Sequence, residues 1–339
     1  MDALYFLGDS KTRIKEVPIP IPNDDEVLLK MKASGICGSD LKNYKAPQSS
    51  KSIFSVPGHE PVGIVEEIGN TVTNVEVGDR VMVHHYMGCL KCSMCRIGFT
   101  QMCPTVKEGY GGILDGGHQE YMKVKSYTCI PIPENLDFLS AAACSCGTGT
   151  AFHAIKRLSM TGMDTIAIFG QGPVGLSATM FAAQLGTKVI AIDVMDYRLN
   201  LAKELGAEIT INPNTDNPES LIRDLTNGIG ADCTLDATGI PNVRIQAVDS
   251  AKLWGKVCFV GEGNMTNFDV SRQIIHKQLT IIGSWTFSQS GLAEVADFVT
   301  EKNSPMSTLI THTFKLNEAQ EAYNIFTSGA SGKIIFSID

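Results

Sequence analysis

The sequence lacks the features of a nucleic-acid-binding, secreted or membrane-spanning protein. It has no run of lysine or arginine dense enough to form a basic stripe, and its formal net charge is −8. Its charge therefore works against a phosphate backbone as a partner. Residues 1–9 have neither the basic start nor the sustained apolar stretch of a secretory signal. We expect a cytoplasmic protein that binds neither nucleic acid nor membranes.

No long apolar run is uninterrupted. Residues 166–186 approach the roughly 20 residues of a membrane span, but glycine, proline and glutamine residues interrupt them. We predict a buried strand followed by a buried helix there. The sequence also contains no internal repeat and no low-complexity tract.

What the sequence does have is the size and composition of a compact two-domain protein. It has 339 residues, 43% of them hydrophobic and 19% charged, which favours two cores over one. The first part shows short β-branched runs broken by turn residues, and it predicts a β-rich domain. The runs lie at residues 27–29, 62–65 and 80–83.

After Ala141 the pattern changes to apolar strands that alternate with longer helical segments, as in a parallel sheet. Each strand is a near-continuous apolar run, suited to a sheet covered on both faces. An amphipathic helix around Leu292–Thr300 and short strands follow. The expected strands are 166–169, 189–192, 233–236, 257–260 and 279–282, and the first two expected helices are 174–185 and 198–205.

Four of the ten cysteines lie close together, at Cys89, Cys92, Cys95 and Cys103. In a reducing compartment, short spacings of this kind indicate a metal site and not disulfides. Four thiolates complete a tetrahedral zinc shell and leave no position for a substrate, so we predict a structural zinc site. A nucleic-acid-binding zinc ribbon uses similar spacings, but the acidic balance disfavours it.

A glycine fingerprint begins where the strand at 166–169 ends. Gly170, Gly172 and Gly175, with Pro173 and Val174 between them, form Gly-x-Gly-x-x-Gly and lead into a helix. The glycines permit a tight turn and a close approach of the backbone to a pyrophosphate, which the helix N-terminus also attracts. We predict a dinucleotide site.

The next strand ends in Asp193, about 20 residues past the glycines, where a carboxylate binds ribose hydroxyls. It would repel the extra phosphate of NADP, and the residues that follow, Val194 and Met195, supply no arginine. NAD is therefore favoured. Arg198 either covers the adenine or is a solvated residue of the first helical turn.

Further polar residues are dispersed over three segments: 35–40 with Cys37, 57–60 with His59, and 143–150 with Cys144 and Cys146. Separated this widely, they do not by themselves prove a site, because buried free cysteines and hydrogen-bonded core histidines are common.

Taken in order, these segments resemble the zinc-containing medium-chain dehydrogenases, which include sorbitol, threonine and secondary alcohol dehydrogenases. The resemblance extends to the closing residues 332–335 and covers nearly the whole chain. It implies an α/β fold with a GroES-like β-rich catalytic domain, residues 1–146 with 287–339 returning to it, and a Rossmann doubly wound parallel-sheet domain, residues 147–286. It also implies a homodimer or homotetramer, often joined through the last Rossmann strand, here 279–284.

The resemblance further implies that Cys37 and His59 bind a catalytic zinc. Cys146 falls in the register of the third ligand, with Cys144 as the fallback, and Glu60 matches a residue that sits beside the zinc or swings in as a ligand.

Around these residues, Asp40 matches a partner that orients a ligand, although a simple turn cap is an alternative. Ser39 matches a hydroxyl that hydrogen-bonds the substrate oxygen and starts a proton relay. Many relatives have a relay histidine five residues past Cys37, where this sequence has Lys42. Lys42 could serve the relay, bind the substrate, or be a surface lysine while the proton leaves through water; we favour the last.

The expected activity is oxidation of a secondary alcohol, with two zinc ions per chain, one catalytic and one structural, and NAD as hydride acceptor. A cysteine as third ligand favours simple alcohols, whereas the lack of an aromatic-rich pocket signal favours polyols, cyclitols or amino alcohols. A simple alcohol dehydrogenase and a non-catalytic NAD-binding zinc protein are the alternatives. Candidate pocket residues, each equally suited to an ordinary core, are Tyr44, Phe54, Tyr110 and Trp285.

Overall fold

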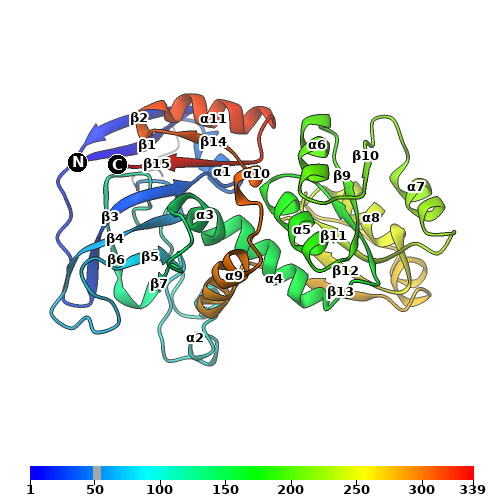
Figure 1. The fold of residues 1–339 in the computed structure, drawn as a ribbon, viewed down its shortest axis with the longest axis horizontal. Helices are drawn as coiled ribbons and strands as arrows, with labels where there is room; N and C mark the ends of the chain where they lie inside the picture. The colour runs from blue at the N-terminus through cyan, green and yellow to red at the C-terminus, as the bar shows by residue number, and fades with distance from the viewer. Residues whose placement is uncertain (49–54) are drawn as a thin grey trace.

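The computed structural model describes residues 1–48 and 55–339. Figure 1 shows two lobes side by side: a β-rich lobe that carries both chain termini, and a second lobe built around another sheet. The α/β architecture predicted from the sequence is confirmed.

The first lobe is built on a seven-stranded sheet whose order is β14-β15-β3-β4-β5-β7, with β6 also pairing with β3. The strands expected at 27–29, 62–65 and 80–83 are present in β3, β4 and β5. Strand β15, near the C-terminus, pairs antiparallel with β3 and so belongs to this sheet. The bounds are β3 Glu26–Gly35, β4 Pro61–Ile68, β5 Arg80–Val83, β6 Tyr121–Lys125, β7 Cys129–Pro131, β14 Ile310–Phe314 and β15 Lys333–Ser337.

Smaller elements complete this lobe. A hairpin of β1 and β2 forms a separate two-stranded sheet, and α11 packs against β2 and β14. Sequence periodicity did not predict α11. The bounds are β1 Asp2–Gly8, β2 Lys11–Glu16, α1 Asp40–Tyr44, α2 Ser93–Arg96, η1 Thr100–Met102, η2 Ser126–Thr128, α10 Met306–Leu309, η5 Leu316–Glu318 and α11 Ala319–Ser328.

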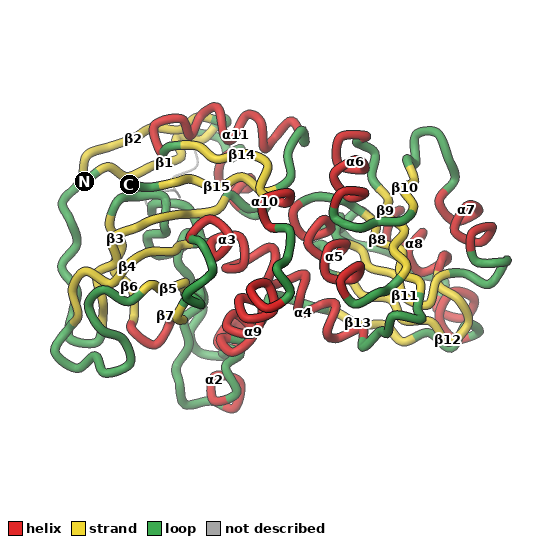
Figure 2. The backbone as a smooth tube through the Cα atoms, viewed as in Figure 1, coloured by secondary structure: helices red, strands yellow, loops and turns green. Residues whose placement is uncertain are grey.

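The second lobe is a doubly wound parallel sheet of the Rossmann type, with strand order β10-β9-β8-β11-β12-β13. Figure 2 shows its helices placed around these strands. The order reverses between β8 and β11, the position where such sheets bind ligands at their carboxyl edge. The bounds are β8 Thr165–Phe169, α5 Pro173–Gln184, β9 Lys188–Ile192, α6 Asp196–Glu204, β10 Ile209–Ile211, α7 Pro218–Leu225, β11 Ala231–Asp236, α8 Pro241–Ser250, β12 Ala251–Phe259, η4 Val270–Ile275 and β13 Thr280–Gly283.

One sequence-based prediction about this sheet is wrong. The apolar run at 279–282 was expected to be covered on both faces, but β13 is largely exposed, with 39% of Ile281 accessible. The reason is its position: β13 is the edge strand of the sheet. By contrast, residues 166–186 form β8 and the 12-residue helix α5, and no helix in the described part of the chain is long and apolar enough to cross a membrane.

A helical segment crosses from one lobe to the other. It consists of α3 Phe138–Ala143, a π-helical turn Cys144–Thr148 and α4 Gly149–Leu158. Its buried alanines share one hydrophobic cluster with residues of both sheets, such as Val62 and Ile168. Helix α9, Gln289–Glu301, packs against α4 and confirms the predicted amphipathic helix.

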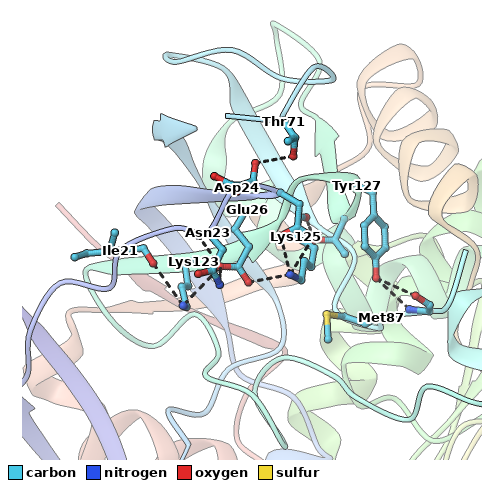
Figure 3. A network of polar contacts seen from close by, with 12 residues as sticks. Ile21, Asn23, Asp24, Glu26, Thr71, Met87, Lys123, Lys125 and Tyr127 are labelled. Carbon is cyan, nitrogen blue, oxygen red and sulfur yellow. Dashed lines mark hydrogen bonds and ion pairs between the residues drawn. The ribbon is translucent and has the colours of Figure 1, made fainter. Parts of the chain in front are cut away.

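A polar network ties β3 to β6 (Figure 3). The carboxylate of Glu26 accepts a hydrogen bond from Asn23 and pairs with Lys123 at 3.6 Å and Lys125 at 3.2 Å. At the other end of the same network, the Tyr127 hydroxyl accepts a 3.1 Å hydrogen bond from the amide of Gly88. This bond fastens the start of the cysteine-rich loop to the turn η2, which follows β6.

Candidate active site and metal centres

Strand pairing in the first lobe brings Cys37 and His59 together. Strands β3 and β4 are antiparallel, and Ser34 pairs with Pro61, so the end of β3 lies beside the start of β4. Cys37 follows β3, and His59 precedes β4. The π-helical turn that crosses between the lobes adds Cys146 to the same place.

The resulting cluster has the dimensions of a metal site. Single ligand atoms of Cys37, His59, Glu60 and Cys146 all lie within 4.8 Å of one another. The two sulfur atoms are 4.0 Å apart, close to the about 3.8 Å that a tetrahedral zinc with Zn–S bonds of about 2.3 Å requires. Cys144 lies in the same turn but outside the cluster, and burial raises the pKa of its thiol to about 12.

Asp40 orients two residues of this cluster, His59 and Cys37, through hydrogen bonds. Its Oδ1 accepts a hydrogen bond from His59 Nδ1 at 3.1 Å, and its Oδ2 accepts one from the amide of Cys37 at 2.8 Å. His59 therefore presents Nε2 to the cluster. That nitrogen lies 3.3 Å from Ser39 Oγ. Helix α1 begins at Asp40, so one short segment supplies a candidate ligand, the hydroxyl and the orienting carboxylate.

Electrostatics inside the cluster favour a cation. A hydrogen bond from Cys146 and the nearby His59 hold the pKa of Cys37 well below its usual range. Burial alone would lower the pKa of His59, but the charges of Asp40 and Cys37 raise it well above its ordinary value. When a metal ion binds, it displaces the protons that such buried ligand atoms hold.

Sequence reasoning missed one partner of this cluster, Lys333. Its side chain is 1% exposed, forms an ion pair with Glu60 Oε2, and donates a 2.8 Å hydrogen bond to the carbonyl of Ile36. Burial raises the pKa of Glu60 to about 7, although Lys333 opposes the shift. The sequence contained a signal for this pair: Lys333 begins the apolar C-terminal strand β15, and a buried lysine needs a partner.

The four-cysteine loop forms a second cluster, in which the Sγ atoms of Cys89, Cys92, Cys95 and Cys103 all lie within 4.8 Å. Backbone amides point at the sulfur atoms, as from Cys92 to Cys89 and from Cys95 to Cys92, both at 3.4 Å. These bonds stabilise thiolates. The loop also binds α9, because the amide of Gln289 donates to the carbonyl of Gly98 at 2.9 Å.

A cavity of about 690 Å³ connects the first cluster with the glycine turn. One wall carries Cys37, Ser39, His59 and Cys146, and another carries residues 172–175. It therefore lies where the two lobes meet, at the carboxyl edge of the parallel sheet.

The glycine turn has the geometry that its sequence predicts. Gly170 adopts a positive φ of +89°, and Gly172 caps α5. A Cβ on Gly175 would lie 1.7 Å from the carbonyl oxygen of Gly170, so only glycine fits there. Pro173 and Val174 begin helix α5, and both line the cavity.

Asp193 and Arg198 both lie beside this turn. Asp193 directly follows β9, and its carboxylate accepts hydrogen bonds from the amides of Gln171 at 2.6 Å and Met195 at 2.9 Å. Arg198 Nε donates to the carbonyl of Ser331 at 3.4 Å, and one terminal nitrogen lies 4.0 Å from the Cβ position of Gly172. Arg198 is therefore part of the turn's surroundings and not a freely solvated residue.

The predicted relay and pocket residues not yet described differ in whether they line the cavity. Lys42 is exposed and does not line the cavity. Tyr44 belongs to the core, where its ring stacks on Tyr323 at 4.8 Å. Tyr110 and Trp285 line the cavity, and Phe54 lies outside the described residues.

Comparisons with known proteins agree with this geometry. Residues 23–134 match the family described as alcohol dehydrogenase GroES-like domain, and residues 173–301 match the zinc-binding dehydrogenase family. The chain is 37% identical to an uncharacterized zinc-type alcohol dehydrogenase-like protein of Escherichia coli, over 99% of this chain and 98% of the relative. It is 33% identical to an L-threonine 3-dehydrogenase of Bacillus subtilis, over 95% and 94%. The solved alcohol dehydrogenase TADH from Thermus sp. ATN1 is 29% identical, with full coverage of both chains and a TM-score of 0.91.

Proposed function

This chain belongs to the family of zinc-binding medium-chain alcohol dehydrogenases, and we propose that it oxidises a secondary alcohol to a ketone with NAD as hydride acceptor. The substrate class that we propose is a polyol, cyclitol or amino alcohol. One observation carries the proposal: a single cavity joins the cluster of ligand atoms to the glycine turn. The relative named L-threonine 3-dehydrogenase is consistent with a secondary alcohol.

In this proposal Cys37, His59 and Cys146 hold a catalytic zinc, and Glu60 is the ligand in reserve, held back by its ion pair with Lys333. The soft sulfur and imidazole donors suit zinc, and three protein ligands leave one position open. When bound, zinc would act as a Lewis acid on the substrate's oxygen. Cys89, Cys92, Cys95 and Cys103 would hold a second, structural zinc, because their four thiolates fill its shell.

The chain's own residues would manage the proton. Ser39 lines the cavity beside His59 Nε2, where its hydroxyl can accept a hydrogen bond from the alcohol and pass the proton on. The hydrogen bond from His59 to Asp40 fixes the imidazole ring, so Nε2 keeps its position beside Ser39 during the proton transfer. Lys42, exposed outside the cavity, takes no part, and we propose that the proton leaves through water.

The coenzyme would bind along the glycine turn. The amides at the start of α5 and the helix dipole attract the pyrophosphate, and Arg198 lies close enough to contribute. Two amide hydrogen bonds hold the carboxylate of Asp193 beside the turn. There it can accept hydrogen bonds from the ribose hydroxyls of NAD and would repel the extra phosphate of NADP. NAD, when bound there, would accept the hydride from the carbinol carbon.

A substrate panel tests the proposal. Purified protein is assayed with NAD and with NADP against polyols, a cyclitol, threonine, simple secondary alcohols and short primary alcohols. We expect NAD reduction with at least one secondary alcohol. Its kcat/KM should be at least about tenfold above the values for primary alcohols and for the same alcohol with NADP. The coenzyme preference follows from the hydrogen bond between Asp193 and the ribose, since one charge-assisted hydrogen bond alone is worth about 1.5–3 kcal/mol. Activity confined to short primary alcohols, or dependence on NADP, would contradict it.

A further inference from the structure

Two segments distant in the sequence form one wall of the active-site cavity. Residues 84–86 follow β5, and residues 285–287 lead from β13 to α9. His84 Nε2 lies 3.1 Å from the carbonyl of Phe287, and the rings of Tyr86 and Trp285 lie 5.6 Å apart. Contacts on both sides therefore hold the middle residues, His85 and Thr286, in the wall.

Both middle residues carry a buried polar atom without a partner. Within the described part of the chain, His85 Nδ1 and Thr286 Oγ1 have no hydrogen bond, although the residues are only 5% and 8% exposed. Both residues line the cavity. Buried polar groups in folded proteins are almost always hydrogen-bonded, so two unsatisfied ones at the same cavity point to a ligand that satisfies them.

The position of His85 indicates which ligand this is. Its ring lies 4.9 Å from that of His59, so it faces the end of the cavity where the reacting alcohol would bind. Ser284 Oγ is also buried without a partner among the described residues, but the amide of Ser284 bonds the carbonyl of Phe259 at the end of β12. Ser284 therefore lies at the coenzyme end of the cavity, away from the reacting alcohol.

We propose that His85 and Thr286 determine substrate specificity by hydrogen-bonding a second hydroxyl, on the carbon next to the one that is oxidised. This inference rests on the proposed function and narrows it: the substrate is a vicinal diol or polyol. An imidazole nitrogen and a hydroxyl can each accept a hydrogen bond, and the hydroxyl can also donate one. A substrate that lacks the second hydroxyl leaves both groups unpaired, the arrangement that discriminates most strongly between analogues.

The test compares two alcohols with the same carbon skeleton, 2,3-butanediol and 2-butanol. For the wild type we expect kcat/KM to be at least about 30-fold higher for the diol. His85→Phe and Thr286→Val remove the hydrogen-bonding atoms and keep similar shapes, and each should reduce this ratio about tenfold. Thr286→Ser keeps the hydroxyl and should keep the ratio within about threefold of the wild type.

A matched control separates specificity from stability. Thr234 Oγ1 in β11 is also buried without a partner among the described residues, but Thr234 does not line the cavity. Thr234→Val should therefore leave the ratio unchanged. Zinc content is measured for every variant, because His85 packs against a proposed ligand.

The outcomes distinguish the two hypotheses. If the wild type is active but His85→Phe and Thr286→Val leave the ratio unchanged, the inference is wrong while the proposed function stands. If both substrates lose activity equally, together with zinc, these residues support the metal site and do not select the substrate. A wild type that oxidises no alcohol refutes the proposed function and the inference with it.

Discussion

Among the described residues, the charged side chains buried near the site are paired with another charge or a hydrogen-bonding group. Lys333 is almost completely buried because Glu60 and the carbonyl of Ile36 surround its ammonium group. Asp40 is buried because His59 and the amide of Cys37 share its two oxygens. Each pair includes a candidate metal ligand, Glu60 or His59, so the burial that makes the pairs costly also fixes the site's geometry.

His118 gives a prediction about acid stability. It is completely buried, with Nδ1 2.8 Å from Ser34 Oγ and Nε2 3.1 Å from the Tyr323 hydroxyl, and burial lowers its pKa to about 4. Because an unfolded histidine titrates near pH 6.5, the unfolded state binds a proton between about pH 6.5 and 4 that the folded state does not. His118 should therefore reduce the free energy of unfolding progressively below pH 6.5, by about 2 kcal/mol at pH 5.

The measurement is urea unfolding of the wild type and His118→Gln at pH 7 and pH 5. The variant is less stable at pH 7 but should lose about 2 kcal/mol less on acidification, since glutamine does not titrate. Protonation of the metal ligands acts equally on both proteins and cancels in the comparison. Equal losses in the two proteins would show that His118 does not carry this dependence.

The sequence predicted some site residues better than others, for physical reasons. Cys89, Cys92, Cys95 and Cys103 are close in the chain, so their spacing alone indicated a cluster. Cys37, His59 and Cys146 meet only because β3 pairs with β4 and a helix crosses between the lobes, and it took a family resemblance to connect them. Lys333 and His85 were missed because a buried ion pair and an unsatisfied nitrogen are properties of packing, which periodicity does not report.

At the scale of elements, the ends of strands and helices make the site. Hydrophobic periodicity predicted most strands, because an apolar run reports burial, and the glycine fingerprint predicted where β8 turns into α5. Periodicity did not predict which strand lies at an edge. The run at 279–282 is as apolar as its neighbours, yet it forms the uncovered edge strand β13.

This edge gives a prediction about assembly. Exposed edge strands invite pairing with another chain. Large apolar side chains are exposed on β13 and close to it: Ile281 in β13, Ile275 just before it, and Trp254 in β12, whose amide bonds the carbonyl of Lys277. We propose that two copies of this chain pair through β13 as a homodimer, or as the dimer unit of a tetramer. Light scattering of the wild type should give a mass of two or four chains, and Ile281→Lys should shift it toward the monomer.

Met163→Lys provides the control for this experiment. Met163 is 93% exposed, but it lies in the loop before β8 and not on the edge strand. The same substitution there should leave the mass unchanged. A monomeric wild type, or equal effects of the two substitutions, would argue against pairing through β13.

At the scale of the whole molecule, the two lobes share one piece of hydrophobic core and one cavity. The segment from α3 to α4 belongs to that core, and its π-helical turn places Cys146 opposite Cys37. The second cysteine cluster lies on a separate loop that is attached to α9 and to the turn η2. We propose that the molecule thereby separates a metal site with one position open to a substrate from a closed metal site that only stabilises the fold.

This separation is the central claim, and metal content measured by mass spectrometry together with NAD reduction tests it most directly. The wild type should contain two zinc ions per chain. Cys37→Ser should contain one and lose activity. Cys144→Ser changes a buried thiol in the same turn as Cys146 but outside the cluster, so this variant should keep two and stay active. One zinc ion in both the wild type and Cys37→Ser would leave only the structural site and contradict the account.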